Sequence, residues 1–239
     1  MENVARSLTA IAQPTVFNLN ESVAVAVFHS WCTEAETAFS QMLPVYQSSI
    51  PQDEQQAPEE LRRQLEDGVA SLYVWYDNHA PYQAAGGAIV VRLNSGIKAL
   101  THFFNAATVR GQGVGKAFLS WLAADMANSN CWLVLEIDAA GEAGIAEDER
   151  LTREHRQALY REAGAREITG VPCHLPLDNA KGTAEKVLML FAPDTVQYLA
   201  EGKVTAMVSQ LFHVAYGKEP SHPDFPAVLR IPVGHHMLV

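Results

Sequence analysis

The chain of 239 residues is 48% hydrophobic and only 18% charged, which is the composition of a folded globular protein and excludes an intrinsically disordered one. Its formal net charge of −10 argues against the broad basic surface that nonspecific nucleic-acid binding requires, and favours small cationic substrates. No apolar stretch approaches the ~18 residues that span a bilayer, and the N-terminus lacks a signal-peptide pattern. We therefore expect a cytoplasmic protein with neither a nucleic-acid partner nor a membrane partner.

The first third of the chain predicts helices joined by a polar loop. Residues 22–47 mix apolar and polar side chains at helical spacing, which indicates one or two helices. Residues 49–58 are polar and proline-punctuated, as expected of a loop. Pro58 then opens a short helix that carries acidic residues in its first turn and ends at Gly68.

Three extended runs follow in quick succession and predict an antiparallel meander. Turn-rich segments separate them, and their sequences are SLYVWYD, AAGGAIVVRLN and IKALTHFFNA. The third run leads into a glycine-rich stretch at residues 110–116 and then into a helical pattern at residues 117–127. A fourth apolar run, CWLVLEID from Cys131, has the length and the β-branched content of a buried strand.

The C-terminal part alternates short elements with one long amphipathic stretch. Residues 139–148 predict a mobile loop, and a helix at residues 151–163 ends at Gly164. The segments AREIT and KVLMLFA are two further strand candidates. From residue 195 to residue 216, one apolar stripe at helical spacing, interrupted only by Gly202, predicts one or two extra helices.

The glycine-rich stretch carries the clearest functional signal, because a strand, a glycine-rich turn and a helix start make an anion site. Backbone N–H groups bind phosphate at such a turn, and glycines let the backbone approach the ligand. Two basic side chains add positive charge beside the positive end of the helix dipole. The predicted phosphate-binding residues are Arg110, Gly111, Gln112, Gly113, Val114, Gly115 and Lys116.

Spacing excludes two nucleotide-binding motifs at this turn. A nucleoside-triphosphate loop needs GxxxxGK followed by Ser or Thr, whereas Gly111 lies only four residues before Gly115 and Ala117 follows the lysine. A dinucleotide-binding turn needs GxGxxG near the start of a βαβ unit, whereas these glycines alternate and follow predicted antiparallel strands. The ligand should still carry a pyrophosphate or a similar group.

Two segments resemble motifs of the GNAT superfamily of N-acetyltransferases. VRGQGVGKAFL resembles the family's coenzyme A loop, whose pattern is Arg/Gln-x-x-Gly-x-Gly/Ala, and Arg110, Gly113 and Gly115 match it. ALYREAGAREI resembles the next motif, in which a helix ends in a Tyr and is followed by a Gly and a strand. Tyr160 and Gly164 match this second motif.

The resemblance implies an α/β fold whose central sheet is mixed, mostly antiparallel, splayed and flanked by helices. It covers residues 15–192, which we expect to form the acetyltransferase domain, and leaves residues 193–239 as a C-terminal helical extension and tail. The apolar stripe of this extension should be buried, either against its own domain or across the two-fold interface of a homodimer. We favour the homodimer. If the stripe is instead buried against its own domain, the extension is available to form part of the wall of the acceptor site.

The resemblance also implies acetyl-CoA as co-substrate and direct transfer, with neither a metal nor a covalent enzyme intermediate. The pantetheine arm would lie between the third and fourth extended runs, where the backbone near Phe104, Asn105 and Ala106 holds the thioester and an N–H polarises its carbonyl. Tyr160 matches the family's partner of the leaving thiolate, although a tyrosine packed at a helix end is an alternative interpretation. Arg153 stands where the family often has a cofactor-contacting Asn, and its guanidinium could meet a phosphate instead.

The general base remains open among several candidates. Glu136 and Asp138 share one face of a strand that ends at the predicted site, and His102 lies on the neighbouring strand. Glu136 is the first candidate, and water is a further one. The adjacent His235 and His236 are interpreted as tail residues, because neighbouring histidines on a tail seldom hold a metal without further ligands.

Together these features predict an N-acetyltransferase that acts on a small-molecule amine, such as a primary amine or an amino sugar. Protein N-termini or lysines are alternative acceptors. A noncatalytic acyl-CoA-binding module is the alternative from another functional class, since it would keep the glycine loop and dispense with the acid and the base.

Overall fold

The computed structural model describes residues 14–78, 83–171, 173–176, 183–219, 221–222 and 231–239. The strands are β1 (Thr15–Asn18), β2 (Val23–Phe28), β3 (Ala70–Asp77), β4 (Ala84–Arg92), β5 (Ile97–Asn105), β6 (Trp132–Asp138), β7 (Arg166–Glu167), β8 (Cys173–Pro176), β9 (Thr183–Phe191), β10 (Tyr198–Ala200) and β11 (His235–Met237). The helices are α1 (Thr33–Ser49), α2 (Pro58–Glu66), α3 (Val114–Asn128), α4 (Glu147–Glu162) and α5 (Glu201–Gln210), with short helical turns η1 (Gln52–Glu54), η2 (Ala107–Val109) and η3 (Leu211–Ala215).

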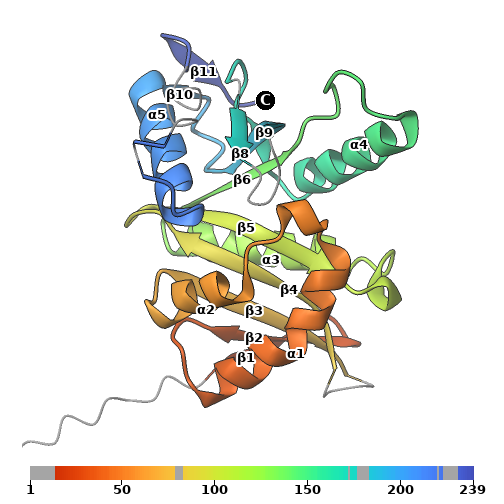
Figure 1. Cartoon of the computed structure of the whole chain (residues 1–239). Coiled ribbons are helices and arrows are strands. Elements are labelled where there is room, and N and C mark those ends of the chain that lie inside the picture. The colour runs from red at the N-terminus through yellow and green to blue at the C-terminus, as the bar shows by residue number, and fades with distance from the viewer. Residues whose placement is uncertain (1–13, 79–82, 172, 177–182, 220, 223–230) are drawn as a thin grey trace, which may run out of the picture.

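One mixed sheet organises this part of the chain. Its strand order is β1-β2-β3-β4-β5-β6-β9-β7, and β8 also pairs with β9. Every described pair in the sheet is antiparallel except the pair of β5 and β6. Helices lie on both faces, with α1 and α2 in front of the sheet and α3 behind it in Figure 1. This arrangement confirms the predicted fold class.

Each face of the sheet has its own hydrophobic core. The core on the first face includes side chains of α1, α2, α5 and η3, and the core on the second face includes side chains of α3 and α4. Successive side chains along each strand point to opposite faces, and each face is covered by a core, so most of the central sheet is buried on both sides. Among the described residues, no helix combines the length and the apolar character needed to cross a membrane.

The prediction of helix from residue 22 onward is wrong for its first part. Residues Val23–Phe28 form strand β2, which pairs with β1 on one side and with β3 on the other, and α1 begins only at Thr33. The sequence VAVAVF alternates in a way that suits a strand buried on both faces: Val25 packs into one core and Ala26 into the other. Tertiary pairing therefore overrode the helical spacing of the wider window.

The predicted meander and the helices around it are confirmed. β3, β4 and β5 are consecutive antiparallel neighbours. Helix α2 spans Pro58–Glu66 and is followed by Gly68 with a φ of 66°. Helix α4 spans Glu147–Glu162, four residues earlier at its start than predicted, and Gly164 after it has a φ of 101°. The left-handed backbone at both glycines explains why glycine ends these helices.

The central pair of strands, β5 and β6, diverges soon after it starts. Only three residue pairs are in register, and the last of them joins Ala99 to Val134. Beyond this point β5 continues to Asn105 beside β4, while β6 continues to Asp138 beside β9. The sheet therefore opens between the two strands, which confirms the predicted splay and leaves room for a ligand.

The C-terminal extension is part of the same core. The stripe that begins in α5 and continues through η3 packs against the first face of the sheet, and its side chains are at most 2% exposed: Val204, Met207, Val208, Leu211, Phe212 and Ala215. This is one of the two outcomes expected for the stripe, burial against its own domain. The stripe therefore needs no second copy of the chain for its burial, and the homodimer stays a prediction without this support.

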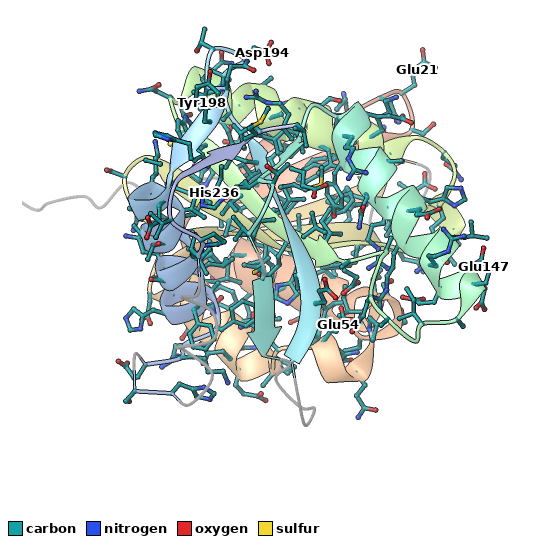
Figure 2. All side chains as sticks on the ribbon, turned by 90° about the horizontal axis from the view of Figure 1, so that it is seen from above. Glu21, Glu54, Glu147, Asp194, Tyr198 and His236 are labelled. Atoms are coloured by element: carbon teal, nitrogen blue, oxygen red, sulfur yellow. The ribbon has the colours of Figure 1, made fainter. Side chains whose placement is uncertain are left out.

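The region on either side of α5 differs from the predicted pattern. Residues Tyr198–Ala200 form strand β10 rather than helix, and they pair with His235–Met237 of β11. The two histidines are therefore not tail residues. His236 is buried, and its Nδ1 and Nε2 lie 3.1 Å from the carbonyl oxygens of Thr169 and Pro232. Figure 2 shows His236, on β11, far from Glu54.

Replacing a large side chain of the buried stripe by alanine should lower the free energy of unfolding. We expect Met207→Ala, at a position 1% exposed, to lower it by about 2–4 kcal/mol through lost transfer energy and a residual cavity. Tyr198→Ala is the control in the same extension, because Tyr198 is 62% exposed and its loss should change stability by less than about 0.5 kcal/mol. If urea denaturation shows a stability loss for Met207→Ala as small as that for Tyr198→Ala, the extension does not share the core.

Candidate active site

A cavity of about 480 Å³ occupies the opening between β5 and β6. Its volume lies in the range typical of small-molecule sites, about 300–1,000 Å³. Both strands, helix α4, the segment after α1 and the end of η3 contribute to its wall. The polar and charged residues in this wall are Ser49, Glu54, Gln56, Thr101, His102, Asn105, Arg110, Glu136, Asp138, Arg156, Tyr160, Lys186 and Tyr216.

The glycine turn lies directly after β5 and leads into α3. Gly113 is the N-cap of α3 with a φ of 76°, and Gly111 has a φ of 77°. No heavy atom lies within 4 Å of where a Cβ would stand at either glycine, so the turn presents open backbone. No side chain caps the helix, which leaves the first N–H groups of α3 available to an anion.

The other residues of the turn have structural contacts as well. Nε of Arg110 donates to the carbonyl oxygen of Asn105 over 3.2 Å, and Nε2 of Gln112 donates to Thr108 over 2.8 Å. Val114 is buried in the core, and Lys116 forms an exposed ion pair with Glu162 at 2.8 Å. Arg110 is thus the basic side chain of the turn that also lines the cavity.

Gly115 allows α3 to pack closely against β5. A Cβ at this position would stand 3.2 Å from Cζ of Phe103 and 3.5 Å from Nδ2 of Asn105. The glycine therefore brings the start of α3 close to the end of the strand that lines the cavity. This close approach joins the glycine turn to the splayed strand pair.

The residues expected to hold the thioester lie at the end of β5. Phe104 is buried against Tyr46, and the Asn105 carbonyl oxygen accepts from Oγ of Ser49 over 3.1 Å in addition to Arg110. The N–H of Ala106 donates to the Ala85 carbonyl over 2.9 Å. The N–H of Ala106 is therefore already used within the sheet, and a different N–H at this strand end would have to polarise the thioester carbonyl.

Strand alternation indicates which N–H groups face the opening instead. In an antiparallel pair, residues exchange hydrogen bonds at every second position. The bond from Ala106 to Ala85 therefore implies that the backbone groups of Phe104 also point toward β4 and those of Phe103 and Asn105 point toward β6. Phe103 was not among the residues predicted from the sequence, because the register of β5 on β4 decides the direction and the sequence does not reveal that register.

Glu136 projects into the cavity from β6. Its strand neighbours Leu135 and Ile137 pack into the core beside α3, so Glu136 lies on the opposite face together with Asp138, as predicted. Oε2 of Glu136 has no hydrogen-bond partner among the described residues. Burial raises the pKa of Glu136 to about 8, against the opposing effect of Lys186. The carboxyl group therefore holds a proton at neutral pH.

Asp138 has a different environment two residues further along β6. Oδ1 lies 2.5 Å from Nζ of Lys186, and Oδ2 lies 2.7 Å from Nη1 of Arg156. Burial alone would raise the pKa of this carboxyl, but Lys186 and then Arg156 outweigh burial and lower it. Both oxygens are engaged, so Asp138 is a poorer base candidate than Glu136.

The same contacts fix α4 against the end of β6. Nε2 of Gln157 donates to the Asp138 carbonyl over 2.9 Å, one residue after Arg156 on the helix. The Arg153 guanidinium, a candidate phosphate contact, is engaged in ion pairs with Glu142 at 2.6 Å and Glu149 at 2.7 Å. These bonds hold the helix that carries Tyr160.

Tyr160 lines the cavity from the last turn of α4 and is 7% exposed. Burial raises the pKa of its hydroxyl to about 12, although the nearby charge of Arg156 acts in the opposite direction. Its ring meets Phe103 edge to face, with the ring centroids 6.3 Å apart. A neutral phenol in this position can donate a hydrogen bond into the cavity.

His102 lies on β5 at the opposite side of the opening. Burial lowers the pKa of its imidazole to about 4, so the ring is neutral at physiological pH. Its Nδ1 lies 3.1 Å from Oγ1 of Thr101, and its ring packs edge to face on Tyr46. The low pKa makes this imidazole a weak proton acceptor.

Two of the three cations in the cavity wall, Lys186 and Arg156, were not predicted from the sequence. Lys186 stands opposite Asp138 in the register of β6 and β9, and Arg156 lies one helical turn before Tyr160. The spacing of Arg156 and Tyr160 was visible in the sequence, because residues four apart share a helix face. The position of Lys186 opposite Asp138 was not visible, since it depends on the pairing of strands that are far apart along the chain.

No protein-family model matches the sequence, and no curated protein sequence matches it. Solved structures match the fold. A protein from Bacteroides thetaiotaomicron assigned to the GNAT acetyltransferases superimposes with a TM-score of 0.62 at 18% identity, over 80% of this chain and 98% of that chain. RimL, a ribosomal alpha-N-protein acetyltransferase in complex with coenzyme A, superimposes with a TM-score of 0.50 at 11% identity, over 74% of this chain and 97% of that chain.

Proposed function

We propose that this chain, which has the acyl-CoA N-acyltransferase fold of the GNAT superfamily, transfers an acetyl group from acetyl-CoA to the amine of a small molecule. The observation that carries this proposal is the opening between β5 and β6. Tyr160 and Glu136 line the cavity in this opening. The glycine turn, with its open backbone, adjoins the cavity through Arg110.

The residues of the opening fit coenzyme A. The open backbone at Gly111 and Gly113, the uncapped start of α3 and the Arg110 guanidinium suit the phosphates. The strand-like pantetheine arm suits the gap, where the backbone groups of Phe103 and Asn105 face away from β4. When bound, acetyl-CoA supplies the activated acyl group, and we propose that these residues hold it.

The Oε2 atom of Glu136, buried without a hydrogen-bond partner among the described residues, favours an amine as the acceptor. Two of the three cations in the wall, Lys186 and Arg156, are paired with Asp138, and the third, Arg110, belongs to the glycine turn. An ammonium group that approaches Glu136 would favour the ionised carboxylate, which lowers the raised pKa of this residue. The end of η3 closes part of the wall, which favours a small molecule over a protein chain.

In the proposed reaction, the neutral amine nitrogen attacks the thioester carbonyl carbon, the new C–N bond forms and the C–S bond breaks. Glu136 in its ionised form takes the proton that the amine loses. A backbone N–H at the end of β5 stabilises the developing oxyanion. The Tyr160 hydroxyl donates a hydrogen bond to the departing sulfur, which is more effective than full proton transfer from a phenol whose pKa is about 12.

The test is a screen of small amines against the purified protein with acetyl-CoA, following release of the free thiol. We expect release that depends on both the protein and the amine, and a higher melting temperature with coenzyme A. A melting shift without amine-dependent release from any small amine, peptide or protein would favour the noncatalytic acyl-CoA-binding module. Release with peptides alone would favour a protein acetyltransferase.

Tyr160→Phe should lower kcat by about 10- to 100-fold and leave coenzyme A affinity nearly unchanged, since its hydrogen bond strengthens as charge develops on the sulfur. Tyr73→Phe is the matched control. Tyr73 is also buried in the core beside α3, burial also raises its pKa, and it lies outside the described wall of the cavity. Equal turnover in the Tyr160 variant and the parent would remove this hydroxyl from the mechanism and favour a packing role.

A further inference from the structure

Two buried glutamine side chains meet at one backbone carbonyl of the C-terminal extension. Nε2 of Gln56 donates to the carbonyl oxygen of Ala215 over 2.9 Å, and Nε2 of Gln64 donates to the same oxygen over 3.2 Å. A carbonyl oxygen has two lone pairs, so these two bonds use both. Gln56 is 6% exposed and Gln64 is 5% exposed.

These contacts fix the direction of each amide group. Only the nitrogen of an amide can donate to a carbonyl, so Oε1 of Gln56 points away from Ala215. The backbone of Gln56 is also held, because its N–H donates to the Tyr46 hydroxyl over 2.8 Å. Oε1 of Gln56 has no hydrogen-bond partner among the described residues, and the same holds for Oε1 of Gln64.

The two glutamines differ in their relation to the cavity. Gln56 belongs to the described wall of the opening between β5 and β6, whereas Gln64 does not. Gln56 shares this wall with Glu136, whose Oε2 is the second buried polar atom without a partner there and is an acceptor when the carboxyl is ionised. A buried acceptor without a donor destabilises the protein, and a ligand that brings a donor to each would remove both penalties.

We propose that Gln56 determines acceptor specificity: its Oε1 accepts a hydrogen bond from a second donor group, a hydroxyl or an amine, that the acceptor carries besides the amine to be acetylated. The inference rests on the proposed acetyl transfer and narrows the acceptor to a small amine with a second donor. Glu136 receives the reacting amine, and Gln56 receives the second group.

The C-terminal extension takes part in this recognition through the Ala215 carbonyl. By holding Nε2 of Gln56, the carbonyl presents the acceptor oxygen of the amide and keeps the donor nitrogen out of the cavity. A rotated amide would offer N–H groups and favour a different ligand. Ala215 and Tyr216 also form part of the wall, so the extension shapes the acceptor end as well as orienting Gln56.

The test compares ω-amino alcohols of increasing length, each with the alkylamine in which a methyl group replaces the hydroxyl. Each pair has nearly the same shape and differs in one donor. We measure kcat/KM with acetyl-CoA, and the Kd of each amine for the protein saturated with coenzyme A. At the length that reaches Gln56, the alcohol should be favoured by about 10-fold in both measurements.

Gln56→Met and Gln64→Met are matched variants for this comparison. Both lose one hydrogen bond to the same carbonyl and one buried amide, so their stabilities should fall by similar amounts. Only Gln56→Met should lose the preference for the alcohol, through a higher KM at unchanged kcat, while Gln64→Met keeps it. Loss of the preference in both variants, or in neither, would overturn the assignment to Gln56.

The parent protein alone also decides the proposal where a variant fails to fold. Alkylamines that bind and react as well as the alcohols at every length would overturn it. Failure of the proposed acetyl transfer has a different signature, namely coenzyme A binding without turnover of any amine. In that case the Kd values still test the subsite, and equal Kd values within every pair would count against Gln56.

Discussion

Glu136→Gln should lower kcat/KM by about 10²–10⁴-fold, the range expected for loss of a general base. Burial raises the pKa of Glu136 to about 8, so the ionised form that accepts the proton becomes populated as pH rises through that value. The ratio of the parental kcat/KM to that of the variant should therefore rise with pH and level off above about 8. Glutamine does not titrate, and deprotonation of the amine, which attacks as the neutral species, raises kcat/KM equally in both proteins and cancels in the ratio. Steady-state kinetics across the pH range measure both effects.

Glu60→Gln is the control, since Glu60 pairs with Arg63 on the outer part of α2 and lies outside the described wall of the cavity. It should retain the activity and the pH profile of the parent. A Glu136 variant with the parental profile would transfer the role of base to water or to His102. The profile separates these two, because burial lowers the pKa of His102 to about 4 and that group would already be neutral far below pH 8.

The same substitution should change the pH dependence of stability. In the folded protein the pKa of Glu136 is about 8, well above the ordinary value of 4.5, so the folded state binds this proton more tightly than the unfolded state does. The resulting stabilisation is fully present below the ordinary pKa and is lost as pH rises through about 8. The stability of Glu136→Gln relative to the parent should therefore increase between acidic and alkaline pH. A constant difference in melting temperature would show that the carboxyl is solvated.

Gly113→Val should abolish the melting shift that coenzyme A gives the parent. At a ligand concentration 100 times Kd, binding stabilises a protein by about 2.7 kcal/mol, and the variant should lose this whole effect. Gly113 has a φ of 76° in open backbone at the start of α3, so a branched side chain there would stand where the phosphates are proposed to approach. Differential scanning fluorimetry with and without coenzyme A measures the change.

Gly68→Val controls for backbone strain in this experiment. Gly68 has a φ of 66°, and no heavy atom lies within 4 Å of where its Cβ would stand, but it follows α2, away from the glycine turn. Both variants should lose about 1–2 kcal/mol of stability, because a side chain disfavours the left-handed conformation. Only the Gly113 variant should lose the response to coenzyme A. An undiminished shift in a folded Gly113 variant would contradict the proposed phosphate site.

The elements that carry the glycine turn could be predicted because their signals are local. The glycines, the apolar strand before them and the helix after them each have a signal within a few residues of sequence, and Gly111 and Gly113 indeed have positive φ. Glu136 and Asp138 could likewise be placed on one face of β6 from strand alternation alone. These signals sufficed to predict the glycine turn and the candidate residues around it, whereas the splay of the sheet was expected from the resemblance to the GNAT motifs.

Features that depend on distant pairing could not be predicted in the same way. β2 forms because β3 offers it a partner, and the helical spacing of the surrounding window concealed this strand. The distinction between Glu136 and Asp138 depends on Lys186, which the pairing of β6 with β9 brings next to Asp138. Gln56 is oriented by Ala215, 159 positions further along the chain. Each of these contacts is tertiary, and the two that involve Asp138 and Gln56 lie at the cavity.

The fate of the acetyl group itself tests the proposed transfer most directly. The protein would be incubated with acetyl-CoA that carries an isotopic label in the acetyl group and with a small amine that supports thiol release, and the amine would be analysed by mass spectrometry. We predict labelled N-acetyl amine as the product, formed at a rate that matches thiol release and that falls with Glu136→Gln. Labelled free acetate with an unmodified amine would contradict acetyl transfer to an amine, because the cavity between β5 and β6 would then direct water to the thioester.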